Sequence, residues 1–143
     1  MTNQSQTHLA SMLQKVPLFS ALKEKQLRTI GGGGKEISYE QGQHIVDEGT
    51  KGIGFFLILD GKVRVRKGNK TLAELKAGDF FGEMSLFDEQ PRSATVEAAT
   101  STKCLVISAW SFVGMVRANP DIAVNLMKEL AARLRQTNKA LAE

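Results

Sequence analysis

Residues 36–107 consist of short apolar runs separated by glycine-rich turns, and this pattern constrains the fold more than any other feature of the chain. The runs recur about every 8 to 12 residues, a spacing typical of the antiparallel strands of a sandwich or barrel. Within one run, Val63 and Val65 alternate with Arg64 and Arg66, which places the valines inward and the arginines in solvent. This part of the chain is therefore predicted to be mainly β.

Two dipeptides predict turns between these strands. Asp60 and Gly61 form one pair, and Gly68 and Asn69 form the other. Both supply residues that adopt the positive φ required by two-residue hairpin turns. We therefore expect each pair to join two neighbouring antiparallel strands.

The two arginines on the alternating strand also raise the possibility of a nucleic-acid surface. Single-stranded nucleic acid is bound by cations interleaved with aromatic residues that stack on the bases. No aromatic residue separates these cations. A solvated outer face is the favoured interpretation.

Helical patterns precede the β region. Residues 11–19 and 20–30 show helical spacing, with Ser20 as an expected N-cap and Leu22, Leu27 and Ile30 on one apolar face. The four glycines at 31–34 are expected to end the helix in a flexible bend, because each costs about 1 kcal/mol relative to alanine in a helix interior. A phosphate-binding loop would need Ser or Thr after Lys35, where the chain has glutamate.

A second helical region follows residue 107. Ser108 is expected to cap a packed helix whose large apolar residues are Trp110, Phe112, Val113 and Val116.

The chain then continues into a last helix. Asn119 is expected at the N-cap of this helix and Pro120 at its first helical position. The negative charge of Asp121 is favourable near the positive end of the helix dipole. An apolar stripe close to heptad spacing runs along it: Ile122, Ala123, Leu126, Met127, Leu130, Leu134, Thr137 and Leu141. The stripe packs either on the β region or on the same helix of a second subunit, and heptad spacing favours the homodimer.

The net charge and the small number of metal-ligating residues limit the kinds of ligand and metal site that the chain can have. The net charge of +4 permits an anionic ligand without requiring one. Cys104 is the single cysteine, and His8 and His44 are the only histidines, too few for an iron–sulfur or structural zinc site. With no disulfide to form, a reducing cytoplasm is the expected location. The longest apolar run, residues 55–59, is too short to cross a bilayer.

Catalytic constellations are also missing from the sequence. A cupin-like jelly-roll enzyme would need clustered histidines with a carboxylate, and a serine hydrolase would need a nucleophile motif such as G-x-S-x-G. Neither pattern occurs, so the chain is expected not to be an enzyme. The jelly-roll enzyme stays as an alternative.

Glu83 and Arg92 stand nine residues apart in a stretch of otherwise apolar and turn residues. An arginine can clamp phosphate oxygens in a bidentate fork, and a carboxylate can accept hydrogen bonds from sugar hydroxyls. Gly82 would let the backbone approach such a ligand closely. Alternatively the two charges pair with each other at the surface, a contact worth about 0 to 1 kcal/mol. Spacing alone does not choose between these interpretations.

The stretch FGEMSLFDEQPRSATVEA at residues 81–98 resembles the phosphate-binding cassette of cyclic nucleotide-binding domains. IVDEGTKGIGFFLILDG at residues 45–61 resembles the glycine-punctuated hairpin that precedes the cassette in that family, whose members include catabolite activator-like and cyclic nucleotide-gated channel-like sensor domains. The resemblance implies an eight-stranded antiparallel jelly-roll β-barrel with N-terminal helices and a long C-terminal helix.

The resemblance also implies a division of the single domain at 1–143. Residues 1–15 are expected to form a flexible tail or short helix, and 16–35 an N-terminal helical part. The barrel is expected at 36–107 with the cassette at 81–94, and the C-terminal helices at 108–143.

Site roles follow from the same resemblance. Arg92 would neutralise the cyclic phosphate and Glu83 would accept from the ribose 2′-hydroxyl, while Thr137 and Asn138 match positions that face the purine from the two subunits of a dimer. cAMP is the expected ligand, although Ser93 can favour cGMP. The expected ligand-binding set is Phe81, Gly82, Glu83, Met84, Ser85, Arg92, Ser93, Ala94, Thr137 and Asn138; Leu86 and Val96 are expected to pack around it.

The implied function is a sensor in which ligand binding docks the last helix over the pocket. No recognition helix follows that helix, so direct DNA binding is not expected, and neither is a membrane anchor. Alternatively the chain is the sensor part of a transcription regulator or channel whose output domain is not included.

Overall fold

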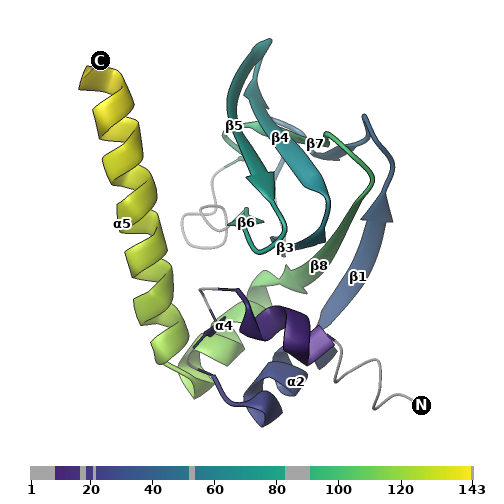
Figure 1. The fold of residues 1–143 in the computed structure, drawn as a ribbon, viewed down its shortest axis with the longest axis vertical. Coiled ribbons are helices and arrows are strands. Elements are labelled where there is room, and N and C mark those ends of the chain that lie inside the picture. The colour runs from purple at the N-terminus through teal and green to yellow at the C-terminus, as the bar shows by residue number, and fades with distance from the viewer. Residues whose placement is uncertain (1–8, 17–18, 21, 52–53, 83–90, 143) are drawn as a thin grey trace.

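The computed structural model describes residues 9–16, 19–20, 22–51, 54–82 and 91–142. These residues form a mainly β fold of two antiparallel sheets with helices at one end and a long helix at the side (Figure 1). The first sheet has the order β1 (Gly34–Tyr39), β8 (Thr102–Ser108), β3 (Gly54–Asp60) and β6 (Phe80–Phe81). The second has the order β2 (His44–Val46), β7 (Thr95–Ala98), β4 (Lys62–Lys67) and β5 (Lys70–Lys76).

One of the two predicted hairpins is present. Lys67 pairs with Lys70 across the β4–β5 turn, and Gly68 has a φ of 59°. The hairpin predicted at Asp60 and Gly61 is wrong, because β3 and β4 belong to different sheets. The positive φ of Gly61, 94°, instead directs the chain out of the first sheet and into the second.

The arginines of β4 are only partly in solvent, which corrects the expected outer face. Arg64 donates to Glu97 of β7 at 3.0 Å, and Arg66 contacts the same carboxylate at 3.2 Å. The pairing register places Arg64 opposite Glu97. Because opposite charges face each other across the strands, these contacts stabilise the β4–β7 pairing.

Helix α2 (Glu24–Gly32) begins and ends later than predicted. Its N-cap is Lys23, whose backbone N–H donates to the Gln26 side chain at 2.8 Å, so Ser20 is not the cap. The helix includes the first two of the four glycines and ends at Gly32, with Gly33 as its C-cap, so the glycine run ends the helix as predicted. No extended bend follows, because β1 begins at Gly34.

Close packing explains two of the four glycines, Gly31 and Gly34. A Cβ at Gly31 would lie 2.8 Å from Cδ2 of Leu9, in the helical segment at residues 9–14. A Cβ at Gly34 would lie 2.8 Å from Cδ1 of the buried Leu105. These two glycines therefore let α2 and the start of β1 approach their neighbours closely.

Helix α4 (Ala109–Ala118) begins as predicted, with the Ser108 hydroxyl accepting from the Ser111 N–H at 3.1 Å. Phe112 is fully buried and stacks on Phe55 with ring centroids 4.7 Å apart. Trp110 was expected to pack as well, but it is 89% exposed, because it lies on the opposite side of the helix from the core.

Helix α5 (Asp121–Ala142) follows after a two-residue break. Asn119 does not serve as its side-chain cap: the Asn119 backbone N–H donates to Met115 O at 2.8 Å, and its side-chain oxygen accepts from Gln26 Nε2. The residue therefore ends α4 and ties it to α2. The first turn of α5 is formed by bonds from Ile122 and Ala123 to the carbonyls of Asn119 and Pro120.

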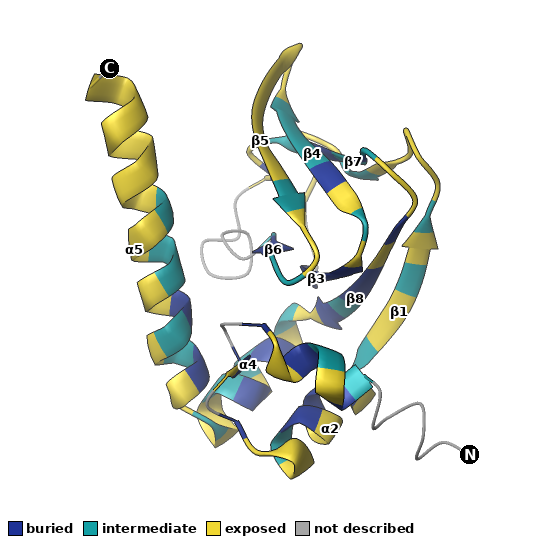
Figure 2. Ribbon diagram, in the orientation of Figure 1, coloured by how far each residue is buried: buried dark blue, intermediate teal, exposed yellow. Residues whose placement is uncertain are grey.

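The apolar stripe of α5 is covered only along its first turns (Figure 2). Ile122 and Leu126 are buried, and Leu130 packs against the core. Leu134 and Leu141 are exposed where the helix runs beside the β-sheets toward the C-terminus. None of the helices in the described part of the chain combines the length and apolar content needed to span a membrane.

Strand β3 separates two cores, which explains why its sequence is a continuous apolar run. Phe55, Leu57 and Leu59 face the helices, while Phe56 and Ile58 face the space between the sheets. A strand buried on both faces loses the polar alternation of a half-exposed strand. The helical core also includes Leu13, Leu27, Ile30, Phe80, Leu105, Ile107, Phe112, Ile122 and Leu126.

We predict that Gly61→Ala destabilises the protein by about 3 kcal/mol. Alanine is strained at the positive φ of this position, and its Cβ would also lie 2.8 Å from Cα of Thr102. Gly42→Ala is the matched control, since Gly42 has a φ of 88° and open space around it; it should cost about 1 kcal/mol. Urea unfolding of both variants measures the difference. Equal losses would show that Gly61 is needed for its backbone angle alone.

The buried thiol predicts a pH dependence at alkaline pH. Burial raises the pKa of Cys104 from 9.0 to about 12. The protonated thiol therefore contributes stability that is fully present below pH 9 and is lost as the pH rises toward 12. Relative to Cys104→Ala, whose lost packing does not depend on pH, the parent protein should lose unfolding free energy between pH 8 and pH 10.5. A constant difference across this range in urea unfolding would contradict the assignment.

Candidate functional site

Arg92 is a buried cation held by two backbone carbonyls. Its side chain is 6% exposed, with Nη2 donating to Gly54 O at 2.9 Å and Nη1 to Gly82 O at 3.1 Å. The guanidinium carbon lies 5.7 Å from the centroid of the Phe56 ring. Because an ionised group is costly to bury without hydrogen-bond partners, the ends of β3 and β6 fix this charge in place. Arg92 is therefore not part of a solvent-exposed surface pair.

The backbone of Arg92 is tied to the turn after β2. Its N–H donates to Thr50 O at 2.7 Å, and the Gly49 N–H donates to Arg92 O at 2.8 Å. The turn is closed by the Thr50 hydroxyl, which donates to Asp47 O at 2.6 Å. Both the main chain and the side chain of Arg92 are thus held by neighbouring segments.

Gly82 makes room for the guanidinium. Its φ is 89°, and a Cβ at this position would lie 2.6 Å from Nη1 of Arg92. A side chain would therefore both strain the backbone and displace the cation. The sequence predicted a close approach of backbone to ligand at Gly82; the structure shows that its close neighbour within the chain is Arg92.

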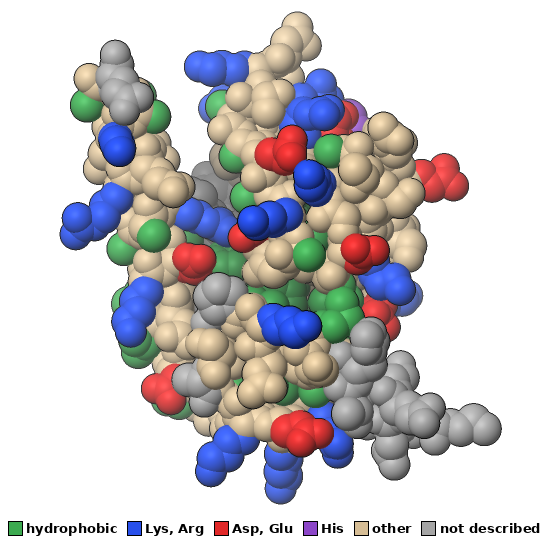
Figure 3. All heavy atoms as spheres, in the orientation of Figure 1, with side chains coloured by type: hydrophobic (Ala, Val, Ile, Leu, Met, Phe, Trp, Pro, Cys, Tyr) green, Lys and Arg blue, Asp and Glu red, His purple; other side chains and the backbone are tan. Residues whose placement is uncertain are grey.

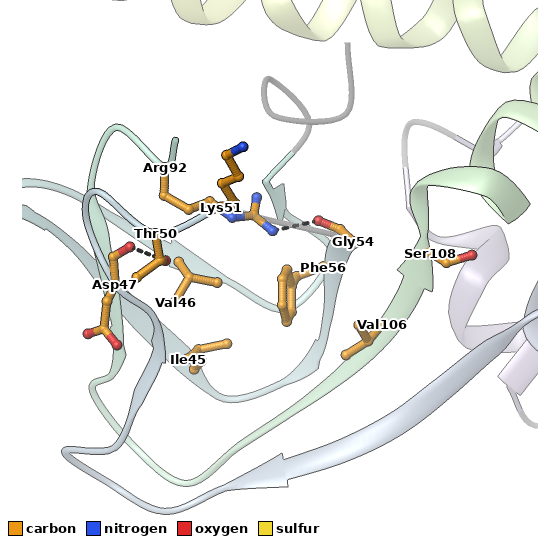
Figure 4. Close-up of a pocket in the computed structure, with 10 residues that line it drawn as sticks. All are labelled: Ile45, Val46, Asp47, Thr50, Lys51, Gly54, Phe56, Arg92, Val106 and Ser108. Atoms are coloured by element: carbon orange, nitrogen blue, oxygen red, sulfur yellow. Dashed lines mark hydrogen bonds between the residues drawn. The ribbon is translucent and has the colours of Figure 1, made fainter. Parts of the chain in front are cut away.

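A cavity of about 390 Å³ lies beside Arg92. This volume falls within the roughly 300 to 1,000 Å³ of small-molecule sites. Figure 4 shows the cationic side chains on one side of the cavity and apolar side chains opposite them. The lining residues are Ile45, Val46, Asp47, Thr50, Lys51, Gly54, Phe56, Arg92, Val106 and Ser108.

The cavity suits a ligand with one anionic end and one apolar body. Arg92 and Lys51 supply positive charge at one side, and Ile45, Phe56 and Val106 supply apolar surface at the other. Among the described residues, no group of three or more histidine, cysteine, aspartate or glutamate side chains is placed to hold a metal ion.

The predicted site residues before and after Arg92 differ in how far they are buried. Phe81 is buried and stacks on Phe56, with ring centroids 4.8 Å apart. Ser93 is exposed and Ala94 partly buried, next to Arg92 in the chain. Val96 is buried in the core between the sheets, in the same cluster as Phe56 and Phe81. The predicted residues Glu83, Met84, Ser85 and Leu86 lie outside the described residues.

Thr137 and Asn138 lie on the exposed C-terminal part of α5 and are not among the residues that line the cavity. The Thr137 hydroxyl donates to the Arg133 carbonyl at 3.0 Å within the helix. Contact between these residues and a ligand would therefore require a movement of α5 or a second subunit.

Sequence reasoning assigned no role to several lining residues, including Ile45, Val46, Lys51 and Val106. They come from β2, the turn after it and β8, which are far apart in the chain. The resemblance of residues 45–61 to a family hairpin was the available signal, but it does not show which side chains face a cavity.

Comparisons with known proteins agree with this geometry. A family profile described as cyclic nucleotide-binding domain matches residues 36–119. The cyclic AMP receptor protein of Thermus thermophilus is 35% identical over 130 residues, which cover 87% of this chain and 60% of that protein. A cAMP-dependent protein kinase regulatory subunit of Mycosarcoma maydis is 36% identical over 63% of this chain and 18% of its own length.

Solved structures show the same likeness. The Thermus thermophilus catabolite activator protein superimposes with a TM-score of 0.80 at 35% identity, covering 88% of this chain and 62% of that one. A cyclic nucleotide-binding domain from Methylobacillus flagellatus gives a TM-score of 0.82 at 25% identity, covering 99% and 84%.

The chain spans at most about 60% of the length of the first curated relatives that it matches. The matched family region extends from β1 to the end of α4 and contains the buried arginine and the cavity beside it. The chain belongs to the cyclic nucleotide-binding domain family.

Proposed function

We propose that this protein is a non-catalytic sensor that binds cAMP through Arg92 and transmits binding through α5. The observation that carries the proposal is the buried guanidinium of Arg92 beside a cavity with an apolar opposite wall. We further propose that the two sheets belong to the eight-stranded jelly-roll barrel of the family. The similarity to a cyclic AMP receptor protein supports cAMP, while a cGMP-dependent protein kinase of Drosophila melanogaster is 33% identical over 94% of this chain and 15% of its own length.

Arg92 is suited to a cyclic phosphate because it is already oriented. Each terminal guanidinium nitrogen carries two N–H groups, so contact with a backbone carbonyl and contact with a phosphate oxygen are compatible at the same nitrogen. The carbonyls of Gly54 and Gly82 fix the plane of the guanidinium before ligand arrives. Binding then requires little reordering of this side chain, which favours affinity.

The remaining ligand contacts are proposed from the family pattern. Glu83 would accept from the ribose 2′-hydroxyl, and Gly82, Ser93 and Ala94 would surround the phosphate. Thr137 and Asn138 would meet the purine once α5 is docked over the cavity or once a second subunit is present. The exposed Leu134 and Leu141 on the same helix support a homodimer, because apolar side chains at near-heptad spacing favour helix pairing.

One contact supports coupling between α5 and the site. Arg133 Nη2 donates to Phe80 O at 2.7 Å, and its guanidinium carbon lies 4.2 Å from the centroid of the Phe80 ring. Phe80 lies in β6, two residues before Gly82, whose carbonyl accepts from Arg92. A ligand that shifts Gly82 would move Phe80 and so change the contact that holds α5 at Arg133. The size of the effect depends on how much more tightly the ligand binds with α5 docked than with α5 released.

The length of the relatives favours a second possibility, that the chain is the sensor part of a longer regulator. The match covers 60% of the cyclic AMP receptor protein and 18% of the kinase regulatory subunit. The output partner would then contact α5, the helix next to the cavity-bearing sheets.

We predict that Arg92→Ala weakens cAMP binding by about 10- to 150-fold, the loss expected for one charge-assisted contact of about 1.5 to 3 kcal/mol. Arg64→Ala is the matched control, because Arg64 pairs with Glu97 outside the cavity lining. Calorimetric titration with cAMP and cGMP measures both affinities, and urea unfolding shows that each variant is folded. Equal affinities of the folded Arg92→Ala variant and the parent would refute the site.

We predict that Arg133→Ala uncouples α5 from the ligand. In the parent, saturating cAMP should slow hydrogen exchange along residues 127–142, and in the variant this additional protection should be lost while cAMP affinity falls by less than about tenfold. Arg135→Ala, an exposed position on the same helix, is the control and should behave as the parent does. Ligand-dependent protection that persists in Arg133→Ala would rule out this contact as the link.

A further inference from the structure

A second cation, Lys51, lines the same cavity as Arg92. Figure 4 shows both side chains on the same side of the cavity, with the Asp47 carboxylate directed away from Arg92. Asp47 contacts His44 Nδ1 at 2.7 Å. Among the described residues, no carboxylate forms an ion pair with Lys51.

The turn that carries Lys51 is bonded to the segment that carries Arg92. Lys51 directly follows Thr50, whose carbonyl accepts from the Arg92 N–H at 2.7 Å. On the other side of the turn, the Glu48 N–H donates to the Thr95 hydroxyl at 3.0 Å. These contacts hold the backbone at Lys51 close to the backbone of Arg92, so Lys51 stays beside the cavity that Arg92 lines.

Two positive charges beside one cavity repel each other, and an anion bound near both removes that cost and gains attraction from both. The flexible stem of Lys51 allows its ammonium group to turn toward such an anion. Most exposed lysines simply keep their ammonium group in water along a solvated face. Lysines of that kind are present elsewhere on this chain: Lys67 and Lys70 lie exposed at the β4–β5 turn, outside the cavity lining. Lys51 differs from them in lining the cavity.

We propose that Lys51 is a second phosphate-binding residue, which contacts the cyclic phosphodiester from the same side of the cavity as Arg92. This inference rests on the proposed function and adds to it a ligand contact outside the cassette. Arg92 provides a rigid, buried clamp, whereas the lysine ammonium is a point charge on a flexible stem that can follow the phosphate. Because Lys51 is exposed, its attraction for the anion is screened by salt far more than that of Arg92.

The test compares Lys51→Gln, Lys51→Arg and the control Lys70→Gln by calorimetric titration with cAMP at two ionic strengths. At about 0.02 M salt, Lys51→Gln should weaken binding roughly fivefold, the upper range for an exposed ion pair. At about 0.5 M salt the difference should shrink to less than about twofold, because the Debye length is then only a few ångströms. Lys51→Arg and Lys70→Gln should bind within about twofold of the parent under both conditions.

The outcomes separate this inference from the proposed function. If the parent binds cAMP and Arg92→Ala loses affinity, but Lys51→Gln matches Lys70→Gln at low salt, Lys51 has no role at the phosphate. A loss in folded Lys51→Gln that does not change with salt also overturns the inference, because it would indicate a structural effect rather than charge. If the parent binds neither cAMP nor cGMP, both the proposed function and the role of Lys51 fail.

Discussion

The guanidinium of Arg92, buried between the carbonyls of Gly54 and Gly82, is the contact on which the site depends. Burial of a charge is tolerated only where hydrogen bonds replace water, and these two carbonyls supply them from the start of β3 and from the residue that follows β6. Gly82 is needed in turn because any side chain there would overlap the cation. The charge at the cavity is therefore built into the packing of the fold and is not a mobile surface group.

Strand β3 connects this contact to the rest of the molecule. Its alternate residues enter both cores, so Phe55 packs with the helices while Phe56 faces Arg92 and Phe81. Helix α5 reaches the same region through Arg133 and Phe80. Helices, sheets and cavity thus meet at β3, β6 and the first half of α5, and the proposed coupling between ligand and α5 would use these contacts. On the face drawn in Figure 3, basic and acidic side chains are interspersed over the sheets and helices, so the positive charge of the site comes from Arg92 and Lys51 and not from a broad basic surface.

Local sequence rules predicted those features that depend on a few neighbouring residues. The cap at Ser108, the turn at Gly68 and the β character of residues 36–107 follow from side-chain and backbone preferences that act within one turn or one strand. The hairpin at Gly61 was wrong, and the flexible bend expected after the helix is replaced by the start of β1 at Gly34, because these two glycines lie against residues distant in the chain. Gly61 lies against Thr102, and Gly34 lies against Leu105. Trp110 was expected to be packed because it is a large apolar residue in a helix rich in such residues, but it lies on the side of α4 that faces solvent.

The sequence by itself determined the mainly β character, the helices at both ends, and, through the pattern around Gly82 and Arg92, the family to which the chain belongs. These properties depend on residue type, periodicity and motif spacing, which are all local along the chain. The tertiary structure decided which strands share a sheet, that Arg92 is buried, and that Ile45, Lys51 and Val106 line one cavity. Such juxtapositions arise when distant segments pack together, and the free energy of that packing is not carried by any one segment.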